Sequence, residues 1–212
     1  MKLQTLPGVF PPRSDSWVLA DTVGAEPLGG GRSLDLCTGS GIAAVAAAMV
    51  GAEATAVDVS RRALACAWYN ARRNGTRVRV RHGNLFEPVG AERFDLISVN
   101  PPYVPCGSDQ LPDRGPQRAW EAGLDGRTLL DEICDHAIDH LRPHGALLVV
   151  HSALIGEEET LHRLAASGLD PAVVVRRRGP LGPLMRAQQR AGRIPSTVDH
   201  EDVVIIRGVR RT

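Results

Sequence analysis

The order of apolar runs along the chain is the feature that most limits its fold. Short runs rich in β-branched residues recur from about residue 33, and a segment with helical periodicity follows most of them. This alternation predicts a doubly wound α/β fold, with a mostly parallel sheet covered by helices on both faces. We expect strands at 33–37, 54–59, 77–82, 94–99, 146–151, 172–175 and 203–208, and helices at 41–50, 60–74, 127–141 and 156–167.

Size and composition exclude several other classes of protein. The 212 residues fit one domain, and a chain with 43% hydrophobic and 23% charged residues is not generally disordered. No apolar run approaches the roughly 18 residues of a membrane span, and the N-terminus has no signal-peptide pattern. The four cysteines show no CxxC spacing, which argues against a zinc site or a disulfide framework. We expect a cytoplasmic protein that neither enters a membrane nor binds a metal.

Four segments, two of which overlap, depart from the regular pattern. The run 77–82 alternates valine with arginine, so we expect it to form an edge strand of the sheet. One face of this strand should be exposed to solvent, and the other, which carries Val78 and Val80, should pack against the core. Two stretches, 101–126 and 179–200, are rich in glycine and proline and predict long irregular loops, which are usually functional. The last segment, 176–212, holds nine arginines against three acidic residues. It could bind RNA or an acidic partner, although an ordinary solvated surface is the simpler interpretation.

A glycine-rich turn follows the first expected strand. The sequence SLDLCTGSGIAA runs from Ser33 to Ala44, and its glycines let the backbone approach a ligand beside a helix N-terminus. Asp58 ends the next strand, where a carboxylate is placed to bind the two hydroxyls of a ribose. The letters also match the dinucleotide pattern GxGxxA, which is weak evidence alone. A turn without a ligand, or a helix cap at Asp58, is the structural alternative.

A second motif, Asn-Pro-Pro-Tyr, ends the fourth expected strand at residues 100–103. In a doubly wound sheet the strand order reverses between the first and fourth strands, so this motif should face the glycine turn. The side-chain oxygen of Asn100 and the carbonyl of Pro101 are two acceptors that suit a flat –NH₂ group, on which Tyr103 can stack. Taken alone, the motif is also compatible with an ordinary turn after a strand.

Together these motifs resemble the HemK/PrmC family of class I S-adenosylmethionine (SAM) methyltransferases, over roughly residues 9–151. That family methylates the glutamine amide of the Gly-Gly-Gln motif in peptide-chain release factors. The resemblance implies a Rossmann-like sheet of seven strands in the order 3-2-1-4-5-7-6. The segment from Val9 to Trp17 is similar to the start of the short archaeal and eukaryotic branch, without the N-terminal helical domain. We expect a single domain over 1–212, with an N-terminal segment (1–30) packed on the cofactor site of a Rossmann-like core (33–212).

The resemblance also implies roles for individual residues. Three positions depart from the family pattern: Cys37 replaces a usual glycine, Asn84 replaces an aspartate beside the adenine, and 120–126 matches the segment after the active site only in part. No metal ligand is implied. By position, SAM would be held by Ser16, Asp35, Cys37, Thr38, Gly39, Ser40, Gly41, Asp58, Asn84, Leu85 and Asn100, the substrate amide by Asn100, Pro101, Pro102 and Tyr103, and catalysis would rest on Asn100, Pro101 and Tyr103.

Several substrates and one partner stay open at this point. A glutamine in a release factor is the leading substrate, and an adenine amine in RNA or DNA, or a small molecule or peptide, are rivals. A nicotinamide-dependent oxidoreductase would fit the glycine letters but would not explain the second motif. The short branch works with a small zinc-binding activator that adds a strand to a sheet edge, which here would be Arg77 to His82. The arginines of this strand can equally serve to discourage pairing.

Overall fold

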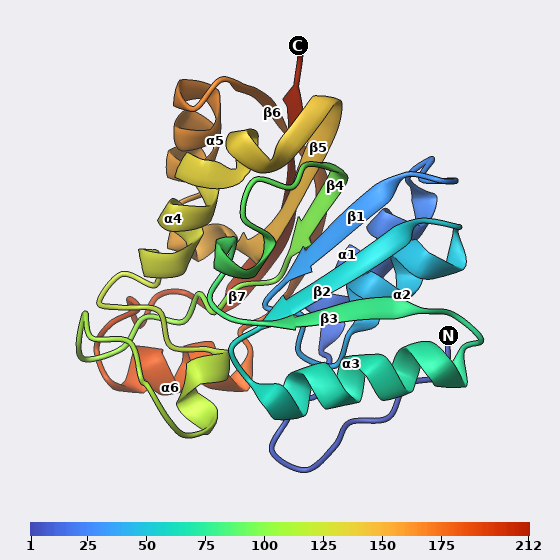
Figure 1. Ribbon diagram of the computed structural model, residues 1–212. Coiled ribbons are helices and arrows are strands. Elements are labelled where there is room, and N and C mark those ends of the chain that lie inside the picture. Colours follow the sequence, from blue (N-terminus) through green and yellow to red (C-terminus); the bar gives the residue numbers. More distant parts are fainter.

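The computed structural model describes residues 1–212 and places a twisted sheet between two layers of helices (Figure 1). The sheet has seven strands in the order β3-β2-β1-β4-β5-β7-β6, which confirms the expected order. Neighbouring strands are parallel except for β7, which is antiparallel to both β5 and β6. The strands are β1 (Arg32–Leu36), β2 (Glu53–Asp58), β3 (Val78–His82), β4 (Phe94–Val99), β5 (Leu141–Ser152), β6 (Leu169–Pro180) and β7 (His200–Arg210).

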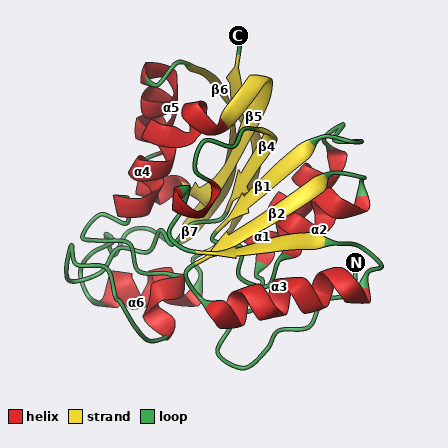
Figure 2. Ribbon diagram, in the orientation of Figure 1, coloured by secondary structure: helices red, strands yellow, loops and turns green.

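Two groups of helices cover the two faces of the sheet (Figure 2). One face packs against α1, α2 and α3, and the alanine-rich sequence of α2 brings that helix close to the strands. The other face packs against α4 and α5, over the side chains of Leu34, Leu36 and Ile97. The helices are α1 (Ser14–Ala25), α2 (Ile42–Met49), α3 (Arg61–Arg73), α4 (Thr128–His136), α5 (Glu157–Ala166) and α6 (Pro183–Arg190), with 3₁₀ turns η1 (Glu87–Val89), η2 (Pro116–Ala119), η3 (Ala137–His140) and η4 (Ala153–Ile155).

The prediction of an irregular stretch over 179–200 is wrong for about half of its length. The antiparallel pairing of β6 with β7 extends to Pro180 and His200, beyond the short apolar runs that were visible in the sequence. Between these strand ends lies α6, which begins with Pro183 in its first turn and buries Met185. Periodicity missed this helix because only two turns form, which is too short a segment for a clear helical period. No helix of the structure is both long and apolar enough to cross a membrane.

Two other boundaries also differ from the prediction. The helix expected over 127–141 is α-helical only to His136, continues as a 3₁₀ turn to His140, and gives way to β5 at Leu141. The stretch 101–126 is not wholly irregular, since it contains η2 and a parallel bridge between Val104 and Glu121. The bridge joins the two ends of the stretch and so gives the loop a fixed base.

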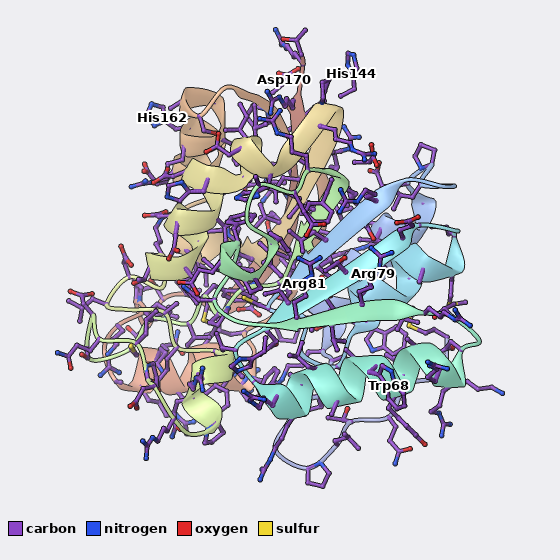
Figure 3. The ribbon with its side chains drawn as sticks, viewed as in Figure 1. Trp68, Arg79, Arg81, His144, His162 and Asp170 are labelled. Carbon is purple, nitrogen blue, oxygen red and sulfur yellow. The ribbon has the colours of Figure 1, made fainter.

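The strand β3 lies at one edge of the sheet, as its alternating sequence predicts. Only part of its expected core face is buried: Val78 is 7% exposed, whereas Val80 is 38% exposed. Figure 3 shows Arg79 and Arg81 extending from β3, with Trp68 on the neighbouring helix α3. Arg79 forms an exposed ion pair with Glu53, and Arg81 pairs with Glu92.

Candidate active site

A cavity of about 440 Å³ lies at the carboxyl ends of β1, β2 and β4. Its walls include the glycine turn, the end of β2, the segment 83–85 and the Asn-Pro-Pro-Tyr motif. The glycine turn and the Asn-Pro-Pro-Tyr motif therefore face each other, as the strand order predicts. The N-terminal segment and the loop around η2 complete the walls. Of the predicted site residues, the cavity is lined by Ser16, Asp35, Cys37, Thr38, Gly39, Ser40, Asp58, Asn84, Leu85, Asn100, Pro101, Pro102 and Tyr103, and only Gly41 is absent from its walls.

The buried carboxylate of Asp35 holds the glycine turn through hydrogen bonds. One oxygen of its carboxylate accepts hydrogen bonds from the Thr38 hydroxyl (2.5 Å) and the Ala44 N–H (3.3 Å). The other accepts from the hydroxyl of Ser98 on β4, at 2.8 Å. Burial raises the pKa of Asp35 to about 6, against an ordinary value of 3.8. Asp35 therefore joins the turn to the neighbouring strand as well as lining the cavity.

Three residues of the turn adopt left-handed backbone angles, with φ of +53° at Cys37, +53° at Gly39 and +82° at Gly41. A Cβ on Gly41 would lie 2.6 Å from the backbone and Cβ of Ala67, so this glycine lets α3 approach the turn. At Gly39 a Cβ would meet no protein atom closer than 3.9 Å, so that backbone is open for a ligand. Cys37 occupies a conformation that favours glycine, which explains the usual family residue there.

Asp58 ties the end of β2 to the same turn. Its carboxylate accepts one hydrogen bond from the Gly39 N–H (2.9 Å) and one from the Ser60 N–H (2.8 Å). Burial raises the pKa of Asp58, while the nearby guanidinium of Arg118 acts in the opposite direction. Arg118 comes from η2 and lines the cavity. It could not be predicted as a site residue, because its loop matches no motif.

The Asn-Pro-Pro-Tyr motif is held from two sides. Asn100 Nδ2 donates to Ser16 Oγ at 3.2 Å, and the Tyr103 hydroxyl donates to Asp15 Oδ2 at 3.0 Å. From the other side Gly126 approaches so closely that a Cβ there would lie 2.4 Å from the Tyr103 carbonyl oxygen. Burial, together with Asp15 and Glu201, raises the pKa of Tyr103 well above its ordinary value. The hydroxyl of Tyr103 therefore stays protonated.

The N-terminal segment forms a wall that local sequence patterns do not reveal. The buried side chain of Asn70 on α3 contacts both the backbone of Gln4 and the carbonyl of Ser40, which links this segment to the glycine turn. Further along, the ring centroids of Phe10 and Trp120 are 5.7 Å apart, and the guanidinium of Arg13 lies over Phe10. Both aromatic residues line the cavity.

The structure contains neither a cluster of potential metal ligands nor an ionised thiol at the cavity. No group of three or more His, Cys, Asp or Glu side chains is arranged to hold a metal ion. The Cys37 thiol is held protonated, because burial and the charges of Asp58 and Asp35 raise its pKa. Beside apolar side chains, the polar residues that line the cavity include Asp58, Asn84 and Asn100.

Comparison with known proteins places the chain among methyltransferases. A model of the methyltransferase small domain matches residues 1–111. The chain is 31% identical over 186 residues to a putative protein N5-glutamine methyltransferase of Methanocaldococcus jannaschii, covering 87% of this chain and 93% of that one. It is 36% identical to a release factor glutamine methyltransferase of Geobacter sulfurreducens, covering 73% of this chain and 56% of the relative.

One further relative and one solved structure are also similar to the chain. A ribosomal protein uL3 glutamine methyltransferase of Bradyrhizobium diazoefficiens is 43% identical over 125 residues, which cover 55% of this chain and 39% of the relative. The chain thus spans about half or less of the length of the two bacterial relatives. Among solved structures, the Mtq2–Trm112 complex of E. cuniculi, which methylates the translation termination factor eRF1, matches with a TM-score of 0.66. That match has 22% identity and covers 96% of this chain and 99% of the other.

Proposed function

The chain belongs to the methyltransferase small domain family, and from that premise we propose that it methylates the side-chain amide of a glutamine in a peptide-chain release factor. It is a SAM-dependent methyltransferase with the Rossmann-like fold of class I enzymes. One observation carries the finer proposal: a single cavity brings an open glycine turn and the ribose-directed carboxylate of Asp58 opposite the acceptors of Asn100 and Pro101. These groups suit an adenosine cofactor and a flat amide, respectively.

The walls of the cavity fit SAM. Gly39 leaves room at the turn, where residues 37–41 would hold the methionine part. Each oxygen of Asp58 has accepted only one backbone hydrogen bond, so each keeps acceptor capacity for a ribose hydroxyl. Asn84 and Leu85 would flank the adenine, and the Asn84 oxygen can accept a hydrogen bond from its amine. When bound, SAM supplies a methyl carbon made electrophilic by the adjacent sulfonium.

The chain's own residues would position and polarise the accepting nitrogen. Asn100 Oδ1 and the Pro101 carbonyl would accept the two N–H bonds of the amide, which draws electron density onto the nitrogen and stabilises the charge that forms there. Tyr103 would stack on the planar amide. The product nitrogen loses its proton easily, so no base near pH 7 is required. Tyr103 is not such a base, since its hydroxyl proton is donated to Asp15.

The test is methylation of purified substrates by the purified protein. With SAM and a release factor, mass spectrometry should find one added methyl group on the Gly-Gly-Gln peptide. Asn100→Ala should slow the reaction about a hundredfold, equivalent to about 3 kcal/mol, while SAM affinity is nearly unchanged. Gln110→Ala, which removes an exposed side-chain amide outside the cavity lining, is the control. Methylation of ribosomal protein uL3, RNA or a metabolite in place of the release factor would overturn the substrate and leave the enzyme class intact.

We also propose that a small zinc-binding activator adds a strand to the free edge of β3. This edge leaves backbone donors and acceptors of β3 free, and Val80 is exposed beside them. Val80→Pro should abolish rescue of solubility by the co-expressed activator, whereas Val174→Pro, at an exposed valine of the opposite edge strand β6, should not. If the chain alone is a monomer on a sizing column and turns over without help, this partner is excluded.

A further inference from the structure

The first turn of α1 contacts both ends of the Asn-Pro-Pro-Tyr motif, although more than eighty residues separate them in sequence. Two adjacent residues make these contacts: Ser16 Oγ accepts from Asn100 Nδ2 at 3.2 Å, and Asp15 Oδ2 accepts from the Tyr103 hydroxyl at 3.0 Å. Asp15 Oδ1 in turn accepts from the Ser16 backbone N–H at 2.7 Å and lies 3.2 Å from the Ser16 hydroxyl. Four side chains thus form one connected network.

The hydrogen-bond capacity of Ser16 determines how the Asn100 amide is turned. A hydroxyl has one proton to donate and two lone pairs that accept. The proton goes to Asp15, while the backbone N–H of Arg13 (3.3 Å) and Asn100 Nδ2 donate to the oxygen. With its proton committed to a carboxylate, the Ser16 oxygen can face only a donor. The NH₂ group of Asn100 therefore points to Ser16, and Oδ1 is left for the substrate.

The second oxygen of Asp15 acts on the other end of the motif. Tyr103 is largely buried, and its hydroxyl has Asp15 as its hydrogen-bond acceptor. This contact fixes the position of the hydroxyl end of the ring on which a flat amide would stack. A hydrogen bond to an ionised carboxylate is stronger than one between neutral groups, so the contact is well suited to hold the ring.

We propose that Asp15 is a positioning residue, which acts through Ser16 and Tyr103 to aim the two groups that receive the substrate amide. The proposal rests on the function proposed above, because it assigns those groups to an amide. No motif in the sequence marked Asp15. Its placement at the start of α1 would otherwise be attributed to the favourable interaction of an acidic side chain with a helix N-terminus.

Kinetics of Asp15→Ala should separate positioning from stability. The matched control is Asp21→Ala, at an exposed aspartate of the same helix that makes no ion pair. We expect kcat on the release factor to fall at least tenfold in Asp15→Ala, because misplaced groups lose near-attack geometry. The dissociation constant for SAM should change less than about threefold, and Asp21→Ala should match the wild type. Equal kcat values for the two variants would overturn the proposal.

A second pair of variants tests the route through Ser16. Ser16→Ala removes the acceptor for Asn100, whereas Ser16→Thr keeps a hydroxyl at the same place and should restore most of the lost kcat. Should Asp15→Ala fail to fold, Asp15→Asn serves in its place, since it keeps the size and loses the double acceptor. A threonine variant as slow as the alanine variant contradicts the proposed route.

Nuclear magnetic resonance separates failure of this proposal from failure of the proposed function. The side-chain amide signals of Asn100, assigned by their loss in Asn100→Ala, report its orientation without any substrate. They should be resolved and slow to exchange in the wild type, and shifted with faster exchange in Asp15→Ala and Ser16→Ala. If the wild type methylates no glutamine but these signals respond, the function is wrong and the network stands. Unchanged signals in both variants would refute the network whatever the activity.

Discussion

The glycine turn and the Asn-Pro-Pro-Tyr motif face the same cavity, yet they are held by different kinds of contact. The turn is fixed mainly from nearby in sequence, since Asp35 bonds to Thr38 and Ala44, and Asp58 bonds to Gly39. The motif is fixed from far away, by Asp15 and Ser16 on one side and Gly126 on the other. The cofactor side therefore rests mainly on contacts between residues fewer than twenty positions apart, with Asn70 and Ser98 as more distant partners. The substrate side depends on Asp15 and Ser16, which lie more than eighty positions away.

The largest effect is expected at Gly41. In Gly41→Ala the new Cβ overlaps Ala67 at 2.6 Å and the residue must keep a φ of +82°, so the free energy of unfolding should fall by about 3 to 5 kcal/mol. Urea unfolding measures this change. Gly39→Ala is the control: it shares the left-handed φ but meets no atom closer than 3.9 Å, so it should lose only about 1 kcal/mol and mainly weaken SAM binding. Equal losses would mean that packing against α3 is unimportant.

The next largest effect is a pH dependence of the free energy of unfolding, which arises from Asp35. Its pKa is about 6 in the fold and 3.8 ordinarily, so the folded state binds the proton more tightly. Stability from this group is fully present below about pH 4 and is lost as the pH rises through 6, by about 3 kcal/mol in total. The difference in unfolding free energy between wild type and Asp35→Asn, measured by urea titration from pH 4 to 7, should show this slope. Parallel curves would contradict it.

A smaller loss of stability with a clear loss of activity is expected for Gly126→Ala. The Cβ would press on the Tyr103 carbonyl oxygen at 2.4 Å, so the motif must shift. We expect about 2 kcal/mol of destabilisation and at least a tenfold lower rate of methyl transfer, with SAM affinity retained. Gly90→Ala, which also has a positive φ but meets no atom within 4 Å, should keep its activity. If Gly126→Ala weakened SAM binding more than it slowed methyl transfer, the glycine turn and the Asn-Pro-Pro-Tyr motif would not be held independently.

The smallest expected effect is a gain in stability when Cys37 is replaced by glycine. Its φ of +53° strains any side chain, so Cys37→Gly should raise the free energy of unfolding by up to about 1 kcal/mol, reduced by the greater freedom of glycine in the unfolded chain. Cys37→Ala, which keeps a Cβ, should show no such gain. Thermal unfolding of the two variants, followed by calorimetry with SAM, checks both stability and binding. A destabilised Cys37→Gly would show that side-chain packing outweighs backbone strain.

Most of the fold could be predicted from the sequence because buried strands and amphipathic helices carry a local signal. Runs such as FDLISV at 94–99 must lie in a sheet interior, and the expected strand order agrees with the structure. The failures occur where a tertiary contact replaces that signal. The two-turn helix α6 is one such case, and the exposed Val80 is another.

The residues of the candidate site also fall into those with a local sequence signal and those brought in by tertiary contacts. The sequence by itself determined the chemistry at the strand ends, because glycines, Asp58 and Asn-Pro-Pro-Tyr each follow directly from an apolar run. The resemblance already named Ser16, but only the tertiary structure showed the distant contacts that complete the site: Ser16 with Asn100, Asp15 with Tyr103, and Arg118 near Asp58. The physical reason is that a hydrogen bond between residues 84 positions apart leaves no periodic trace in the chain. Such contacts exist only once the sheet has brought their elements together.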